Sequence, residues 1–217
     1  MHFNLEALEK KQNMVLRDKF KTLLILALLA SVTGCSSTRE IKLDNHFPSV
    51  LSSPKEIKAT IVFNEEFTDY IANPNNRTTI EMGKAQVNLL SSAFQGLFNE
   101  PEFVPTREEA DPNSQLVITP SVHEVQISTP SQTYLNVYEV WIKYNLKIED
   151  VNGELIDNWF MPAYGKTPDS FLLSKTSAIK EASVVALRDA GAKLLLDFYR
   201  IPSVYGWLRQ QEQKASP

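Results

Sequence analysis

The most regular pattern of hydrophobic and polar positions in this chain runs over residues 138–149. Every second residue from Tyr138 to Ile148 is apolar, and the residues between them are mostly charged or polar. Such alternation predicts a strand with one dry and one wet face, as in an antiparallel sheet that is covered on one side. The Asp-Val-Asn-Gly sequence of residues 150–153 then predicts a tight turn, which returns the chain as a second strand through residues 155–161.

Three further segments have the composition of strands. Residues 57–63 form a β-branched run that suits a buried strand, and residues 102–105 predict a short one. Residues 116–127 predict a longer strand, but the apolar positions change parity along it. A bulge or bend near Pro120 would reconcile the two parities, so we expect one there.

Residues 84–98 instead show helical spacing. Leu90 and Phe94 belong to an apolar stripe, and Gln86 belongs to the opposite, polar face. The other residues of the stripe are Val87, Ala93 and Leu97. This pattern predicts an amphipathic helix that packs on another part of the fold.

A longer helix is predicted to run to about Tyr199, with Pro202 ending it. Ser174, Thr176 and Ser177 all offer N-caps for its start. Small side chains recur in its buried stripe, and they permit a close approach to a sheet. These small residues are Ala182, Ala186 and Ala190. The residues after Pro202 are expected to form a tail.

The predicted elements follow the order β-α-β-β-β-β-α. With a meander that is wet on one face, this order indicates an α+β fold, a two-layer sandwich in which two helices cover one face of a mostly antiparallel sheet. We place this single domain over residues 56–217. The polar residues 64–77 are expected to be a loop, in which Phe67, Tyr70 and Ile71 are candidates for a binding edge.

Charge and cysteine content exclude several classes of protein. The chain has 22 Lys and Arg residues against 26 Asp and Glu residues, a net charge of -4, which gives no positive field for a nucleic acid backbone. We therefore expect no nucleic acid partner. A single cysteine cannot form an intramolecular disulfide or a cysteine-based zinc site. The motifs of nucleotide-binding proteins and metalloproteases are also missing, and we expect no metal and no cofactor.

The single cysteine, Cys35, follows a segment with the features of a secretory signal. From Met14 the chain has basic residues, then an apolar run over residues 23–32, and then small residues. This run is about half of the roughly 20 residues that a bilayer-spanning helix needs, which favours a cleaved signal over a permanent span. We assign residues 1–34 to a signal peptide, with Met14 as its expected true start.

The residues Val32-Thr33-Gly34-Cys35 resemble the lipobox of bacterial lipoproteins. The resemblance covers only residues 14 to about 36, but its parts occur together and in order. It implies cleavage before Cys35, a thioether-linked diacylglycerol on Cys35 and acylation of the freed amine, because a thiolate is a good nucleophile for alkylation. Several acyl chains on one residue amount to near-permanent anchoring in a membrane.

The same resemblance predicts the location of the mature protein. In bacterial lipoproteins an Asp after the lipidated cysteine commonly signals retention in the inner membrane, and this chain has Ser36 there. We therefore expect the periplasmic side of the outer membrane, with the inner membrane as the alternative. Residues 35–55 are polar and contain two prolines, which predicts a flexible tether.

Charge predicts how the mature protein meets the membrane. Residues 1–34 hold five basic and three acidic residues, so their removal leaves a net charge of -6. An acidic protein gains nothing from attraction to anionic lipids. We therefore expect membrane contact through the acyl chains alone.

Residues that carry catalysis are sparse in the sequence. The histidines are His2, His46 and His123, of which the first two lie in the signal peptide and the tether. His123 and Glu124 are adjacent in a predicted strand, so their side chains should point to opposite faces. Pairs of acids in polar segments fit a solvated surface better than a catalytic pair: Glu65 with Glu66, and Glu108 with Glu109. Motifs of hydrolases, metalloproteases and nucleotide-binding proteins are missing, so we expect a non-enzymatic protein.

Aromatic residues are the better candidates for a site. Trp141 interrupts the polar face of the alternating strand, and an indole there either anchors a partner or is covered by a loop or tail. Tyr205 and Trp207 lie in the predicted tail, where they either pack back on the domain or meet another protein. Trp141, Tyr205 and Trp207 are therefore the candidate partner-binding residues.

The element order and the anchor together resemble small outer-membrane lipoproteins of the bacterial envelope. Examples are the lipopolysaccharide-assembly lipoprotein and the auxiliary lipoproteins of ABC-type lipid transport. This resemblance implies a non-enzymatic accessory subunit that binds an envelope protein. A carrier of an apolar ligand such as a lipid is the alternative, and it needs an apolar cavity larger than roughly 300 Å³. A hydrolase would need His123 or clustered acids in a cleft.

Overall fold

The computed structural model describes residues 38–44, 47 and 51–215. Its strands are β1 (Arg39–Lys42), β2 (Ala59–Val62), β3 (Ile71–Asn75), β4 (Thr78–Glu81), β5 (Glu102–Val104), β6 (Leu116–Ser128), β7 (Val137–Glu149) and β8 (Leu155–Pro168). Its helices are α2 (Glu65–Thr68), α3 (Gly83–Leu97), α4 (Pro130–Thr133), α5 (Lys175–Asp197) and α6 (Pro202–Ala215), with the 3-10 turns η1 (Arg107–Glu109), η2 (Phe171–Leu173) and η3 (Phe198–Arg200). No helix in the described ranges has the length and hydropathy needed to cross a bilayer.

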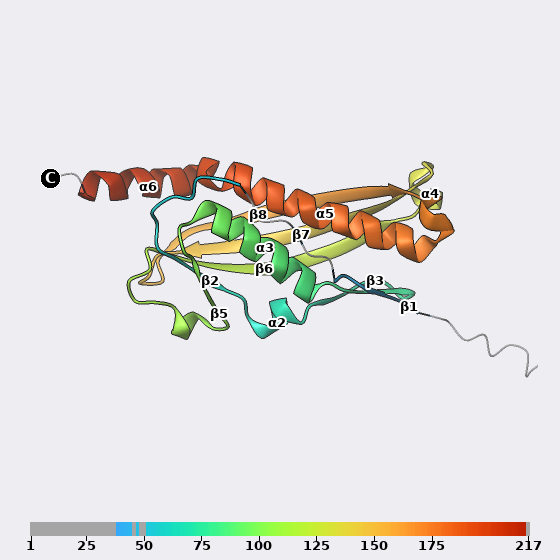
Figure 1. Ribbon diagram of the computed structural model, residues 1–217, viewed down its shortest axis with the longest axis horizontal. Coiled ribbons are helices and arrows are strands. Elements are labelled where there is room, and N and C mark those ends of the chain that lie inside the picture. The colour runs from blue at the N-terminus through green and yellow to red at the C-terminus, as the bar shows by residue number, and fades with distance from the viewer. Residues whose placement is uncertain (1–37, 45–46, 48–50, 216–217) are drawn as a thin grey trace, which may run out of the picture. The chain divides into compact units, whose positions relative to one another are not determined.

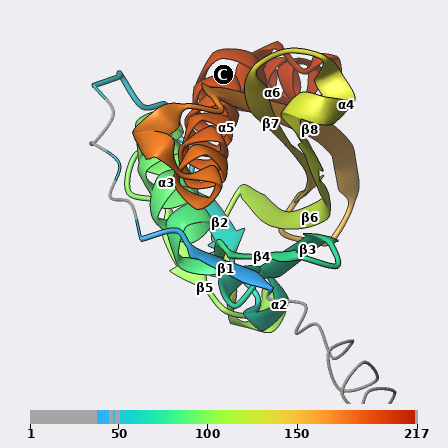
Figure 2. The ribbon, with the colours of Figure 1, turned by 90° about the vertical axis from the view of Figure 1, so that its right-hand side faces the viewer.

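A five-stranded sheet with the order β5-β2-β6-β7-β8 forms one layer of the fold. β2 runs parallel to β5 and β6, whereas β6, β7 and β8 form a long antiparallel meander. α3 and α5 lie together on one face of this sheet (Figure 1, Figure 2). The α+β two-layer sandwich predicted from the element order is confirmed.

The alternation along β7 produces the inner and outer faces of the meander. The apolar side chains at every second position from Tyr138 to Ile148 are each at most 5% exposed, because they face α3 and α5. The side chains between them lie on the outer face and are mostly polar. The prediction of one buried and one solvated face from the alternating pattern is therefore confirmed.

α5 lies unusually close to β8. A Cβ atom on Gly165 of β8 would lie 2.1 Å from the carbonyl oxygen of Ala182 and 2.4 Å from the amide nitrogen of Ala186, both in α5. Only glycine in the strand and small residues in the helix allow two backbones to approach to this distance. The close approach predicted from the alanine stripe is confirmed.

Gln86 of α3 lies on a different face from the one predicted. It is fully buried, and its Nε2 donates a hydrogen bond to the Phe67 carbonyl oxygen at 2.7 Å while its Oε1 accepts one from the Tyr144 hydroxyl at 3.2 Å. The prediction was wrong because α2, expected to be a loop, covers this side of α3 and brings a carbonyl that needs a donor. Burial raises the pKa of Tyr144, so its hydroxyl stays protonated and donates.

The strands of the meander depart from prediction in two places. The pairing of β6 with β7 skips His123, so the expected β-bulge is present but lies three residues beyond Pro120. β8 continues to Pro168, well beyond its predicted end at Met161, because β7 offers pairing partners along its full length.

A second sheet with the order β1-β4-β3 was not predicted. β1 lies in residues 35–55, where a flexible tether was expected, yet its Ile41 is only 2% exposed and it pairs in parallel with β4. Phe67, expected in a loop, is also 2% exposed and belongs to the core, so it marks no binding edge. Both differences arise because the packing partners are distant in the sequence.

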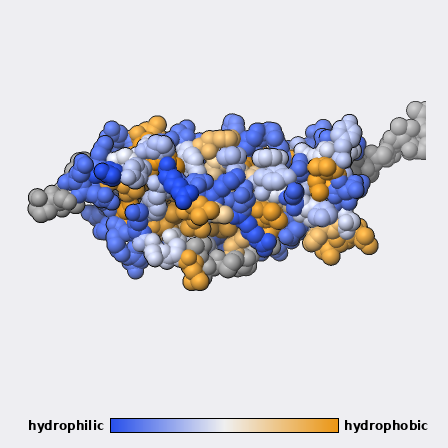
Figure 3. Space-filling view, turned by 90° about the horizontal axis from the view of Figure 1, so that it is seen from above, coloured by the Kyte–Doolittle hydropathy of each residue, from blue (hydrophilic) through white to orange (hydrophobic). Residues whose placement is uncertain are grey.

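The chain after α5 forms a helix instead of the predicted tail. α5 ends at Asp197, and η3 separates it from Pro202, which is the first residue of α6, where a missing N–H group costs nothing. α6 lies at one end of the meander, and α4 lies at the other (Figure 1). Figure 3 shows hydrophobic side chains gathered at the right-hand end of the domain, which is the α4 end.

Candidate functional site

Cys35, the predicted lipid-attachment residue, lies outside the described residues. The predicted signal peptide lies outside them as well. Lipid attachment at Cys35 therefore stays a prediction. The candidate surfaces that follow all belong to the folded domain.

Trp141 lies on the outer face of the sheet and is 38% exposed, so no loop or C-terminal segment among the described residues covers it. Its ring contacts the ring of Tyr164 on β8, with 4.4 Å between the ring centroids and 43° between the planes. The contact follows from the register of the two strands, which places Trp141 opposite Tyr164. The neighbouring ring holds the indole in place and leaves one side of it open.

The exposed apolar surface continues along β8. Phe160 is 49% exposed, Pro162 is exposed as well, and both share the outer face with Tyr164. We call Trp141, Phe160, Pro162 and Tyr164 the outer-face patch. The sequence prediction missed three of these residues. Pro162 and Tyr164 lie beyond the predicted end of β8 at residue 161, and Phe160 was not assigned to a face of the sheet. The register of β8 with β7 places them on the outer face with Trp141, and the hydrophobic pattern alone does not give this register.

Polar groups border the outer-face patch. The Tyr164 hydroxyl donates a hydrogen bond to Glu139 Oε1 at 2.7 Å, and Lys143 pairs with Glu124 across β6 and β7. Burial, together with the Glu139 carboxylate, raises the pKa of Tyr164 to about 12. The Lys143 ammonium lowers the pKa of Glu124. The patch therefore has neutral aromatic rings at its centre and fixed charges at its border.

The free edge of β8 is capped beside the patch. Asp189 of α5 accepts a hydrogen bond from the Tyr164 amide at 2.8 Å, and Lys193 donates one to the Pro162 carbonyl at 2.6 Å. Asp189 and Lys193 also form an ion pair at 2.9 Å. Pro162 has no N–H group to offer an added strand. This part of the edge is therefore occupied and does not offer free backbone groups to an added strand.

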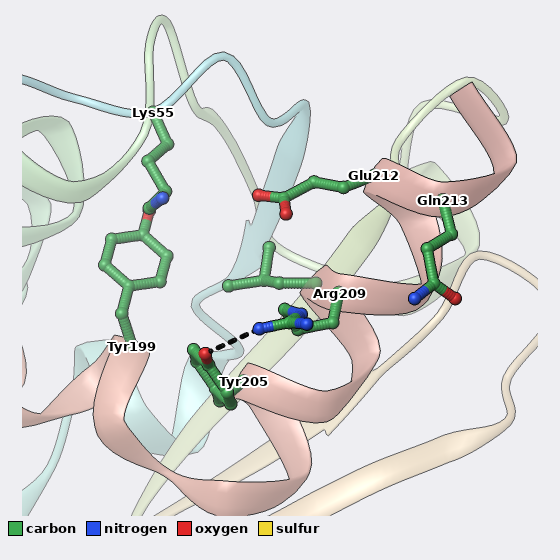
Figure 4. A pocket seen from close by; sticks show the side chains of 7 residues that line it. Lys55, Tyr199, Tyr205, Arg209, Glu212 and Gln213 are labelled. Carbon is green, nitrogen blue, oxygen red and sulfur yellow. Dashed lines mark hydrogen bonds between the residues drawn. The ribbon is translucent and has the colours of Figure 1, made fainter. Parts of the chain in front are cut away.

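The C-terminal helix forms a second candidate surface. Trp207 packs back against the core, whereas Tyr205 is 52% exposed. Tyr205 borders a groove of about 660 Å³ between α6 and the chain near Lys55 (Figure 4). The other side chains that line it are Lys55, Tyr199, Leu208, Arg209, Glu212 and Gln213. Most of these are polar or charged, which is unsuited to an apolar ligand.

Side chains with catalytic potential do not converge in the described part of the chain. His123 is exposed on its bulge, and Glu124 is paired with Lys143. Glu65 and Glu66 lie exposed in the first turn of α2. No three His, Cys, Asp or Glu side chains among the described residues are grouped so that they could hold a metal ion.

The space between the sheet and the helices is filled with side chains. The side chains at the centre of this space are each at most 1% exposed to solvent: Ile142 and Leu146 of β7, Ala163 of β8 and Leu187 of α5. A cavity large enough for a lipid would expose the side chains that line it. These central positions of the core therefore leave no room for an apolar ligand.

No known family model and no curated protein matches the chain. Among solved structures, a neuraminyllactose-binding hemagglutinin homolog from Helicobacter pylori is 11% identical with a TM-score of 0.50, and the match covers 80% of this chain and 100% of that one. A protein of the DUF330 family from Xanthomonas campestris is 10% identical with a TM-score of 0.47, covering 83% and 98% of the two chains. A minor lipoprotein from Acinetobacter baumannii is 12% identical with a TM-score of 0.39, covering 67% and 92%.

Identities this low show a similarity of fold and nothing more specific. The Helicobacter pylori structure supports the α+β architecture over four fifths of this chain. Similar folds serve unrelated functions, so function has to be argued from the surface chemistry of this chain.

Proposed function

We propose that this protein is a lipoprotein of the outer membrane that faces the periplasm and binds an envelope protein as a non-enzymatic accessory subunit. The lipobox resemblance at Cys35 supports the anchor, and Ser36 supports the outer membrane. The observation that carries the binding role is the exposure of Trp141 within the outer-face patch.

The outer-face patch has the composition and the rigidity of a binding surface. Tryptophan and tyrosine are enriched among residues that dominate binding energy, and such residues cluster at the centre of an interface with polar groups around them. Trp141 and Tyr164 lie on long, paired strands, so little conformational freedom is lost when a partner binds. The ion pair of Lys143 with Glu124 gives the border a fixed charge pattern that can orient a partner.

The alternative functions have less support. A carrier of an apolar ligand needs an apolar cavity, but the core between the sheet and the helices is filled, and the groove beside α6 is lined mainly by polar groups. A hydrolase needs grouped catalytic residues, but His123 is exposed on a strand bulge, and Glu124 beside it is paired with Lys143.

Crosslinking in intact cells tests the proposal. The full-length, tagged protein is crosslinked and captured, and co-purifying proteins and lipids are identified by mass spectrometry. Trp141→Ala is compared with Tyr205→Ala, which removes an exposed aromatic ring at the other candidate surface. We expect Trp141→Ala to reduce capture of one defined envelope protein by about tenfold or more, as for the loss of an interface anchor, and Tyr205→Ala to leave it unchanged.

Other results would contradict the proposal in distinct ways. Loss of the partner in Tyr205→Ala alone would move the binding site to the groove beside α6. Capture of a stoichiometric lipid without any protein would favour the carrier. Both variants must retain the thermal unfolding midpoint of the wild-type protein, which is expected because both side chains are exposed.

A further inference from the structure

The α4 end of the domain exposes large apolar side chains from two neighbouring turns. Tyr134 and Leu135, which follow α4, are 93% and 58% exposed. Leu172 and Leu173 in η2 are 74% and 95% exposed. We call these four residues the apolar tip. Figure 3 shows hydrophobic side chains at this end of the domain.

The backbone holds the apolar tip outward in a conformation that L-amino acids rarely adopt. The φ angles of Tyr134, Leu172 and Leu173 are 56°, 48° and 51°. Left-handed backbone at residues other than glycine is costly, and it gathers at functional sites. A hydrogen bond of 3.0 Å from the Asp169 amide to the Asn136 carbonyl oxygen joins the two turns. The exposure of these side chains is therefore built into the turns.

A groove of about 970 Å³ lies at the same end of the domain, and its walls include both α4 and the first residue of α5. Arg39, Arg77 and Lys175 line this groove, which we call the cationic groove, together with a single acid, Asp169. All three cations are exposed, and none of them forms an ion pair with another described residue. This end is locally basic in a mature chain whose net charge is -6.

The covalent chain ties the proposed lipid anchor to the same end. β1 begins at Arg39, four residues after Cys35. An extended chain spans at most about 3.6 Å per residue, so a linker of four residues can reach at most about 14 Å from Arg39. Because Arg39 lines the cationic groove, acyl chains on Cys35 would enter a membrane beside this groove and not at the α6 end.

We propose that the apolar tip and the cationic groove form a docking surface for an anionic lipid bilayer. The apolar tip inserts among the headgroups, and Arg39, Arg77 and Lys175 contact lipid phosphates. Exposed apolar side chains beside unpaired cations are the combination that binds the surface of such a membrane. The inference rests on the proposed anchor at Cys35. From the net charge we expected membrane contact through the acyl chains alone, and the docking surface adds direct contacts of the protein with the membrane.

A fluorescent label on the tip tests the docking surface. Cys35 is the single cysteine and is blocked when acylated, so Leu173→Cys gives one labelling site in the full, lipidated protein. The protein is placed in vesicles of phosphatidylethanolamine and phosphatidylglycerol that contain a nitroxide-labelled lipid. The matched control is Leu155→Cys, an exposed leucine at the opposite end of β8.

We expect nitroxide lipids to quench the label at residue 173 by about twofold or more and to leave the label at residue 155 unquenched. Replacing phosphatidylglycerol by phosphatidylcholine should reduce quenching at residue 173, because the attraction to anionic lipid is lost. Equal quenching at the two residues would overturn the inference. Equal quenching in the two lipid mixtures would overturn the role of the cationic groove.

The wild-type chain separates failure of the anchor from failure of the docking surface. If Cys35 is not acylated, the wild-type protein itself takes up the thiol label, and the proposed anchor and the docking surface fail together. If the wild-type protein stays unlabelled and floats with the vesicles, but residue 173 is not quenched, the anchor stands and the docking surface alone is wrong.

Discussion

The two faces of the β6-β7-β8 meander are made by alternate residues of the same strands, yet they are built differently. On the inner face, Gly165 contacts the backbone of α5, and Tyr144 satisfies the buried Gln86. On the outer face, Trp141 and Tyr164 lie against each other and remain partly exposed. The inner face thus stabilises the fold, whereas the outer face has side chains that can change without loss of the fold.

The largest effect on the inner face is expected from Gly165→Ala. The added Cβ would meet the Ala182 carbonyl oxygen at 2.1 Å and the Ala186 amide nitrogen at 2.4 Å, and backbone atoms of a packed helix cannot move aside as a side chain can. We expect a loss of about 3 kcal/mol or more in the free energy of unfolding, measured by urea denaturation.

Gly206→Ala is the matched control for this substitution. Gly206 lies in α6, and a Cβ there would meet no atom within 4 Å. Alanine favours a helix over glycine by about 1 kcal/mol, so the control should be neutral or stabilising. A cost below about 1 kcal/mol for Gly165→Ala would mean that α5 can move away from β8, and the inner face would then be less constrained than the structure indicates.

A smaller loss is expected from Gln86→Leu, which removes the polar link between α2, α3 and β7. The Phe67 carbonyl would lose its donor and the Tyr144 hydroxyl would lose its acceptor, and both are buried there. Two unsatisfied buried groups should lower the free energy of unfolding by about 2 kcal/mol or more. Gln95→Leu on the exposed side of the same helix is the control, and its effect should stay within about 0.5 kcal/mol. Equal costs for the two variants would contradict the role of Gln86.

The sequence could predict those features of the fold that depend on local patterns, but not those that depend on contacts between distant segments. The alternation along β7, the turn after it and the alanine stripe of α5 are local signals, and they gave the α+β sandwich. β1 pairs with β4, and Gln86 donates a hydrogen bond to a carbonyl oxygen of α2. Both features depend on contacts between segments that are distant in the sequence. A polar residue in a helical pattern cannot show whether it faces water or a buried carbonyl.

The candidate surfaces could be predicted only where they lie on a strand with clear alternation of hydrophobic and polar residues. Trp141 stood out in the sequence because it interrupts a polar face. It is exposed, which the interpretation as an anchor for a partner required. Phe160 and Tyr164 join it only through the register of β8 with β7, which hydrophobicity alone does not give. The apolar tip lies in irregular turns, where neither helical nor strand periodicity applies.

The smallest effect is expected on the outer face, where the ionisation of Tyr164 reports its surroundings. Burial and the Glu139 carboxylate raise its pKa to about 12 from 10.0, the ordinary value. Glu139→Gln removes the charge but leaves the burial, so the pKa should fall towards 10.0 without reaching it. The difference in tyrosinate absorbance between each protein and its Tyr164→Phe variant isolates this group from the six other tyrosines.

The raised pKa also gives Tyr164 a defined effect on stability. Because the folded state holds the phenol proton more tightly than the unfolded chain, the contribution is fully present below pH 10.0 and is lost as the pH rises through about 12. Relative to Tyr164→Phe, the urea midpoint of the wild-type protein should therefore fall over this range, and by less in Glu139→Gln. A pH dependence that is the same with and without Glu139 would mean that burial alone sets the pKa. The Glu139 carboxylate would then have no electrostatic effect on the Tyr164 ring, and the charge at the border of the patch would come from the Lys143–Glu124 pair alone.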